Sequence, residues 1–166
     1  WSSDVCSSDL AAIASMTRLN REAAAAGRAL PAGSVSACTD VTGFGLAGHA
    51  CEMAEASGVV LEIDGTALPI LPGAAALAAG NLPGGARTNR EHFGARVELG
   101  PGVADPLPLL VFDPQTSGGL LMAVSPGASA VLLATLRQGG VDAHQIGRVS
   151  PGRAGAPIVQ IGRAHV

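Results

Sequence analysis

The 166-residue sequence contains no lysine, so all ten of its basic residues are arginine. Neither a Walker-type lysine on nucleotide phosphates nor a Schiff-base lysine can therefore come from this chain. Any phosphate group that the chain binds must be held by arginine, by backbone N–H groups or by a metal ion.

Aromatic residues and positive charge are also scarce. The chain has three Phe, one Trp and no Tyr, and its formal net charge is −3. Stacking on bases needs aromatic side chains, and tracking a phosphate backbone needs a basic surface, so we expect no nucleic-acid partner. No apolar run reaches the length of a bilayer span, so we expect no membrane association either.

The three cysteines are odd in number and have no C-x-x-C spacing. Cys38 and Cys51 lie in apolar surroundings, and no Ser/His/Asp or Cys/His constellation can be assembled around them. Structural thiols in a reducing, cytoplasmic setting are the simplest interpretation.

The two ends of the chain differ in character from the rest. Residues 1–10 have neither a charged n-region nor an apolar h-region, so they are not a signal peptide. They resemble translated sequencing-adaptor residue, as do residues 162–166, and we interpret both segments as non-native. We therefore expect the chain to be a piece of a longer protein, with a linking helix and loop over 11–34 and an α/β domain over 35–161.

Apolar periodicity and turn residues predict the order of elements. Predicted helices span 11–27, 46–57, 72–79 and 128–138, and predicted strands span 35–38, 59–64, 109–112, 120–124, 145–149 and 157–161. Residues 80–102 are predicted to be mainly loop. In the second helix Leu46, Ala50, Met53 and Ala54 share one side, and Gly58 follows as a stop. The order predicts an α/β (α+β) fold, with a mixed sheet and helices packed on it.

A glycine-rich turn follows the first predicted strand. Gly43, Gly45 and Gly48 satisfy G-x-G-x-x-G ahead of a helix, which is the pattern of a dinucleotide-binding turn. Polar Asp40 and Thr42 precede this turn, and the rest of the chain lacks the regular alternation of a doubly wound sheet. The dinucleotide hypothesis therefore stays as an alternative.

The same residues suit a second chemistry. A carboxylate at Asp40, just ahead of glycines that open a helix, can hold Mg²⁺ while free N–H groups face phosphate oxygens. A third possibility is that Asp40 or Thr42 only caps the helix.

Three further segments carry weaker signals. The loop Asp113–Gly119 combines a turn, three polar side chains and two glycines, and could form an anion-holding nest or simply connect two strands. The segment Pro83–Arg90 places two Arg and a Thr beside glycines, which suits a phosphate but equally a solvated loop. His49 and Glu52 share a helix face, and without further ligands we expect a structural pair rather than a metal site.

Three ordered strings, ACTDVTGFGLAGHACEMAEASGV, LPILPGAAALAAGNLPGGARTN and FDPQTSGGLLMAV, resemble the selenophosphate synthetase (selenide, water dikinase) family over about residues 11–161. The resemblance implies the C-terminal domain of an aminoimidazole ribonucleotide synthetase-like enzyme. The implied reaction converts selenide, ATP and water to selenophosphate, AMP and phosphate. Asp40 matches the family aspartate that helps to bind Mg²⁺ at the ATP phosphates. The resemblance implies that Thr42, Gly43 and Gly45 shape the same edge. Further expected cofactor-binding residues match family motifs without individual roles: Asn89, Gln115, Thr116, Ser117, Gly118 and Gly119.

The departures from the family pattern also matter. The family's N-terminal half carries the catalytic cysteine or selenocysteine, an essential lysine, a glycine-rich segment and the other metal-binding aspartates. None of these lies in this chain, and Cys6 falls in the suspected adaptor segment. The resemblance therefore implies a fragment with no catalytic residue, inactive alone, from an enzyme that dimerises when complete. A dinucleotide-binding domain, a hydrogenase-maturation or thiamine-phosphate kinase type of ATP enzyme, and a non-catalytic interaction domain remain alternatives.

Overall fold

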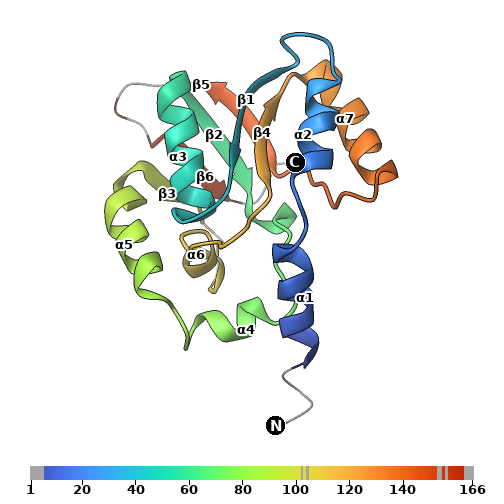
Figure 1. The fold of residues 1–166 in the computed structure, drawn as a ribbon. Coiled ribbons are helices and arrows are strands. Elements are labelled where there is room, and N and C mark those ends of the chain that lie inside the picture. Colours follow the sequence, from blue (N-terminus) through green and yellow to red (C-terminus); the bar gives the residue numbers. More distant parts are fainter. Residues whose placement is uncertain (1–5, 102, 104, 153–154, 156, 163–166) are drawn as a thin grey trace.

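A computed structural model describes residues 6–101, 103, 105–152, 155 and 157–162, and Figure 1 shows the path of the chain. The helices are α1 (Cys6–Met16), α2 (Arg21–Arg28), α3 (Gly45–Ser57), α4 (Ala74–Ala78), α5 (Gly84–Phe93), α6 (Leu107–Leu110) and α7 (Pro126–Gln138). The strands are β1 (Val35–Asp40), β2 (Val59–Asp64), β3 (Val97–Leu99), β4 (Leu120–Val124), β5 (Gly147–Pro151) and β6 (Val159–Gly162). Short 3-10 turns, Gly65–Ala67 and Gly94–Arg96, follow β2 and α5.

The strands form two separate sheets. Strands β1 and β4 pair antiparallel, with Asp40 opposite Leu120. The other sheet has the order β3-β6-β2-β5, in which β6 runs parallel to both β2 and β3 while β5 is antiparallel to β2. The predicted α/β fold with a mixed sheet is confirmed.

Helix α3 packs its small side chains against the four-stranded sheet. Ala47, Ala50, Cys51 and Ala54 have no exposed surface, and they recur at the spacing of one helix face. Their short side chains bring the helix close to the buried residues of β2 and β6, which are Leu61, Ile63, Val159 and Ile161. This buried face is rotated from the predicted one, because Leu46 and Met53 are only partly buried.

The boundary between α3 and β2 agrees with the sequence prediction. Gly58 ends the helix with a left-handed φ of 65°, a conformation that glycine adopts without steric penalty. Strand β2 then covers the predicted range, Val59–Asp64.

The prediction of one helix over 11–27 is wrong, because α1 ends at Met16 and α2 begins at Arg21. At the end of α1 the Thr17 hydroxyl and the Thr17 N–H both bond the Ile13 carbonyl. Between the helices the Asn20 side chain donates a hydrogen bond to the Gly118 carbonyl at 3.0 Å. This long-range contact fixes the break, and nothing in the local Ala-rich pattern indicates it.

Two further predictions are wrong. Residues 80–102 contain α5 and β3, and α5 buries Ala86, Asn89 and Phe93 along one face although two glycines begin it. Residues 109–112 are not a strand, since 107–110 form α6. A short apolar run fits a buried strand or a buried helical turn equally well, so tertiary context decides.

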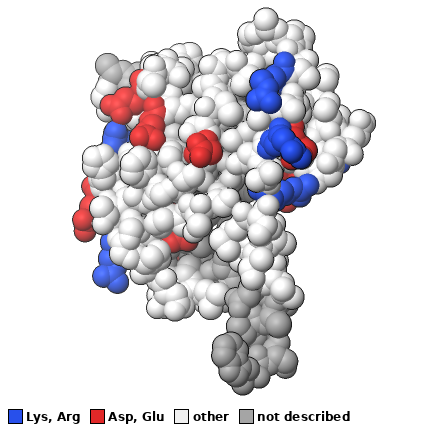
Figure 2. Space-filling model, in the orientation of Figure 1, with Lys and Arg blue, Asp and Glu red and all other residues white. Residues whose placement is uncertain are grey.

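Charge is sparse over the face shown in Figure 2, where arginines gather over α2 and acidic side chains over α3. Within the described ranges, no helix has both the length and the apolar character needed to cross a bilayer.

Cys38 and Cys51 differ in environment. Cys51 lies in the core, and burial raises the pKa of its thiol to about 11. Cys38 is exposed on β1, and partial desolvation together with the nearby Asp40 charge raises the pKa of its thiol to a smaller extent.

We therefore expect iodoacetamide to modify Cys38 in the folded chain well before Cys51. At about pH 8 a thiol with a pKa of about 11 is ionised in roughly one molecule in a thousand, and burial further blocks access. Peptide mass spectrometry after timed labelling measures the two rates, with denatured protein as the control in which they converge. Equal rates in the folded chain would contradict the burial of Cys51.

Candidate functional site

Asp40 lies at the end of β1, where the chain leaves the two-stranded sheet. The next residue, Val41, donates its N–H to the Gly119 carbonyl at 2.9 Å. The Asp40 side chain is exposed, and among the residues that the structure describes its carboxylate has no hydrogen bond or ion pair. The predicted metal ligand is thus a solvent-facing carboxylate that is free to coordinate.

A tight turn over residues 42–45 leads from β1 into α3. Gly45 donates its N–H to the Thr42 carbonyl at 3.0 Å and has a φ of 67°. A Cβ on Gly45 would lie 2.8 Å from the Asp113 carbonyl oxygen, so only glycine fits this approach.

The interpretation that Asp40 or Thr42 caps α3 is wrong. The N-cap residue is Phe44, and no side chain makes a cap hydrogen bond. The Ala47 N–H is instead donated to the Val111 carbonyl at 2.8 Å, from the segment after α6. Two N–H groups near the helix start, those of Gly45 and Ala47, are therefore satisfied inside the protein.

The buried side chain of Asn89 links the turn after β1 to the segment that precedes the Asp113–Gly119 loop. Its side-chain amide donates hydrogen bonds to the Gly43 carbonyl at 2.9 Å and to the Phe112 carbonyl at 3.0 Å. The residue is 6% exposed. In this arrangement α5 holds the turn after β1 against the segment that leads into the Asp113–Gly119 loop.

The loop Gln115–Gly119 lies beside the same turn. Gln115 donates its N–H to the Thr42 carbonyl at 2.9 Å. A Cβ on Gly118 would lie 2.5 Å from Gln115 Oε1 and would also overlap the Val41 carbonyl oxygen. Gln115, Thr116 and Ser117 are exposed. We call the surface formed by Asp40–Gly45 and Gln115–Gly119 the motif edge.

All three motifs that the sequence singles out thus meet at the turn over residues 42–45.

Asp113, at the start of the Asp113–Gly119 loop, is half-buried, and desolvation raises the pKa of its carboxyl above the ordinary value. The segment Pro83–Arg90 contributes mainly through Asn89, since Arg87 and Arg90 are exposed.

Sequence reasoning missed a contact of His49. The expected pair is confirmed, because His49 Nδ1 lies 3.1 Å from Glu52 Oε2. On the other side of the ring, His49 Nε2 lies 3.1 Å from Thr42 Oγ1. A helix pattern reveals partners three or four residues apart but not one seven residues back across a turn. Within the described part of the chain, no group of three or more His, Cys, Asp or Glu could hold a metal ion.

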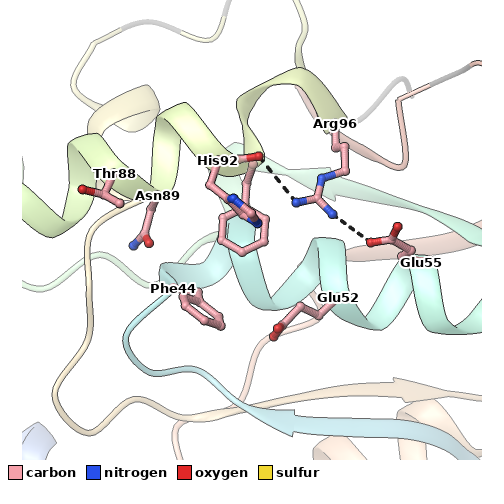
Figure 3. Close-up of a pocket in the computed structure, with 8 residues that line it drawn as sticks. Phe44, Glu52, Glu55, Thr88, Asn89, His92 and Arg96 are labelled. Atoms are coloured by element: carbon pink, nitrogen blue, oxygen red, sulfur yellow. Dashed lines mark hydrogen bonds and ion pairs between the residues drawn. The ribbon is translucent and has the colours of Figure 1, made fainter.

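A groove of about 430 Å³ opens next to the motif edge, between α3 and α5. Figure 3 shows its lining residues, which are Phe44, Glu52, Glu55, Thr88, Asn89, His92, Phe93 and Arg96. Arg96 bonds Glu55 at 2.8 Å and lies 4.9 Å from the centroid of the Phe93 ring. The positive charge of Arg96 is therefore already paired with Glu55 in the wall of this groove.

The dinucleotide hypothesis has no structural basis in this topology. The strand before Gly43 is β1, whose partner is the antiparallel strand β4. Strand β2, which follows α3, belongs to the other sheet, so β1, α3 and β2 do not make a βαβ unit. Gly45 instead lets the turn approach the backbone of Asp113, and Gly48 leaves room for the Phe44 and Phe93 side chains.

Comparison with known proteins agrees with this geometry. Residues 4–160 match the protein family described as AIR synthase related protein, C-terminal domain. The chain belongs to this family. A solved structure with the same fold is that of E. coli HypE, a hydrogenase maturation protein. It superposes with a TM-score of 0.52 and 27% identity, over 84% of this chain and 34% of that one.

Several curated relatives of this AIR synthase-related domain are selenide, water dikinases. The chain is 46% identical over 134 residues to that of Nitratidesulfovibrio vulgaris, covering 80% of this chain and 37% of the relative. It is 43% identical over 152 residues to that of Trichlorobacter lovleyi, covering 90% and 42%. It is also 43% identical over 129 residues to that of Escherichia coli K12, covering 76% and 36%. The chain thus spans well under half the length of the curated relatives that it matches.

Substitution of Gly45 by Ala should destabilise the fold more than the same change at Gly58. Both glycines have a left-handed φ, which costs an alanine about 1–2 kcal/mol. Only Gly45 faces a close backbone neighbour, so Gly45→Ala should lose about 2 kcal/mol more. Urea unfolding of the two variants measures the difference in free energy. Equal losses would show that the approach of Gly45 to Asp113 is not tight.

Proposed function

We propose that this chain is the C-terminal part of a selenide, water dikinase, which converts selenide, ATP and water to selenophosphate, AMP and phosphate. In this proposal the motif edge forms one side of an ATP–Mg²⁺ site, and the rest of the longer protein forms the other. The observation that carries it is the meeting of three separate motifs at the turn that directly follows Asp40, whose carboxylate is exposed. The selenide, water dikinase relatives, at 43–46% identity, support the choice of reaction.

The donor set at the motif edge suits Mg²⁺ bound together with a nucleotide. Magnesium prefers hard oxygen ligands and retains several waters, and in nucleotide sites one or two carboxylates complete its shell. Asp40 supplies one such carboxylate, which is too little for a dedicated metal site. When bound, Mg²⁺ would neutralise charge on the phosphate oxygens.

The other proposed site residues act by shape and hydrogen bonding. Thr42, Gly43 and Gly45 form the turn that places Asp40 beside the loop. The exposed Gln115, Thr116 and Ser117 are available to the nucleotide. Gly118 lets this loop pack closely against Val41, and the Gly119 carbonyl accepts the Val41 N–H. Asn89 belongs to the site as the side chain that joins its two halves. Nucleophile and general acid or base are supplied from outside this chain.

An exposed apolar surface supports contact with the rest of the longer protein. Ile13 and Met16 of α1 are 51% and 43% exposed, at a spacing that places them on one helix face. Helix α1 extends away from the sheets, toward the N-terminus in Figure 1. Such a face is normally covered in a native assembly. The proposal places the complete enzyme in the cytoplasm as a homodimer.

A second candidate is an ATP enzyme of the hydrogenase-maturation type. The likeness to HypE favours it, since that chain shares the fold and 27% identity. Higher identity to selenide, water dikinases makes it the lesser candidate. Selenide-dependent formation of AMP by the full-length parent protein distinguishes the two.

We expect this chain alone to form no selenophosphate, because phosphoryl transfer needs several positioned groups and a single carboxylate supplies little. In the full-length parent, Asp40→Asn should lower ATP turnover about 100-fold, since it removes a charged metal ligand. Selenide-dependent AMP production measures both effects. Asp142→Asn, an exposed carboxylate after α7, serves as the control. Unchanged turnover and Mg²⁺ dependence in Asp40→Asn would instead favour a non-catalytic interaction domain.

A further inference from the structure

His49 is a buried titratable side chain that the proposed ATP–Mg²⁺ chemistry does not use. It is 8% exposed, and both of its ring nitrogens have partners. The Phe44 ring lies 5.3 Å away between centroids and helps to fix the orientation of the imidazole. The ring therefore connects the turn after β1 with Glu52, a residue that lines the neighbouring groove.

The chemistry of these partners sets the direction of each hydrogen bond. A carboxylate oxygen only accepts, so His49 Nδ1 must carry the proton that it shares with Glu52. In the neutral imidazole, Nε2 is then the acceptor, and the Thr42 hydroxyl must donate to it. Because the Thr42 hydroxyl donates its proton to His49, Thr42 Oγ1 can act only as a hydrogen-bond acceptor toward a ligand.

The backbone of Thr42 is fixed at the same time. Its carbonyl oxygen accepts from Gly45 at 3.0 Å and from Gln115 at 2.9 Å. Thr42 is therefore held through its main chain by both halves of the motif edge and through its side chain by His49. Thr42 is also only partly buried.

We propose that Glu52 and His49 are positioning residues that fix the Thr42 hydroxyl as a hydrogen-bond acceptor at the motif edge. An acceptor two residues from Asp40 suits a donor such as a water molecule of a hydrated cation, and it is unsuited to direct contact with a phosphate oxygen. The direction of the hydrogen bonds follows from the two contacts of His49 together with a neutral imidazole. The identity of the ligand rests on the proposed function.

The first test reads the His49 tautomer in this 166-residue chain by two-bond ¹H–¹⁵N correlation at about pH 8. We expect the proton on Nδ1, because Glu52 accepts it. Glu52→Ala should shift His49 toward the Nε2-protonated form. Glu55→Ala, three residues further along α3 and paired with Arg96, is the matched control and should leave the His49 signals in place. A proton on Nε2 in the wild type, a doubly protonated ring, or no response to Glu52→Ala would overturn the proposal.

The second test uses two substitutions of His49 in the full-length parent. A Gln amide reaches the position of Nε2 and can still bond Thr42, whereas an Asn amide reaches only that of Nδ1. We expect His49→Asn to raise KM for Mg-ATP about tenfold with kcat within about twofold, and His49→Gln to raise KM less than about threefold. Equal KM values for the two variants would contradict a role through Thr42.

A further pair covers the case in which both His49 variants fail to fold. Thr42→Val removes the hydroxyl at nearly constant volume, and Thr42→Ser keeps it, so Val should raise KM for Mg-ATP more than Ser does. Equal effects would again overturn the proposal. If the parent shows no selenide-dependent turnover, the proposed function fails, while the tautomer experiment still decides the positioning role of His49 and Glu52.

Discussion

The buried amide of Asn89 joins two loops that belong to different parts of the chain. Both of its N–H groups are donated to main-chain carbonyls, one before α3 and one after α6. A buried carbonyl that loses its donor pays a desolvation penalty of about 1–3 kcal/mol, so the two bonds together stabilise a single relative placement of these loops. The position of Asp40 against the Gln115–Gly119 loop, and of Thr42 against His49, depends on this placement.

The two hydrogen bonds of Asn89 also bring backbone segments close together. Asn89 draws the turn after β1 toward the segment after α6, and Ala47 donates to Val111 across the same junction. At such distances a side chain at Gly45 would meet the Asp113 carbonyl. Two glycines of the pattern that resembles a dinucleotide turn, Gly45 and Gly48, are thus required here by protein packing against protein. A glycine pattern alone cannot distinguish these two causes, because both require the absence of Cβ.

The predictable parts of the fold are those determined by local cues. The range of β2 and the end of α3 follow from alternation and from Gly58, and both agree with the structure. Helix α5 was not predicted, because its two initial glycines disfavour a helix and tertiary burial of Phe93 overrides them. The break between α1 and α2 is likewise set by a contact from Asn20 to a loop almost a hundred residues away.

For the candidate site, the motif residues could be selected from the sequence, but their connections could not. Resemblance to a family pointed to Asp40, Asn89 and the Gln115–Gly119 loop, yet gave Asn89 no role. The structure assigns it a pair of buried hydrogen bonds. The contact between Thr42 and His49 crosses a turn, where neither helix nor strand periodicity applies.

The charge at the motif edge constrains how the nucleotide of the proposed function could bind there. Asp40 is the one charged residue in the ranges 40–45 and 115–119, and the whole chain lacks lysine. Arg96 and Arg148 are engaged with Glu55 and Glu62 at 2.8 and 2.6 Å. A triphosphate placed directly against this edge would meet like charge, and Thr42, with its proton committed to His49, could not offset it with a hydrogen bond. In the proposed site, a cation would lie between the edge and the phosphates, and the positive side chains for the remaining phosphate oxygens would come from beyond the motif edge, either from exposed arginines such as Arg87 and Arg90 or from the rest of the longer protein.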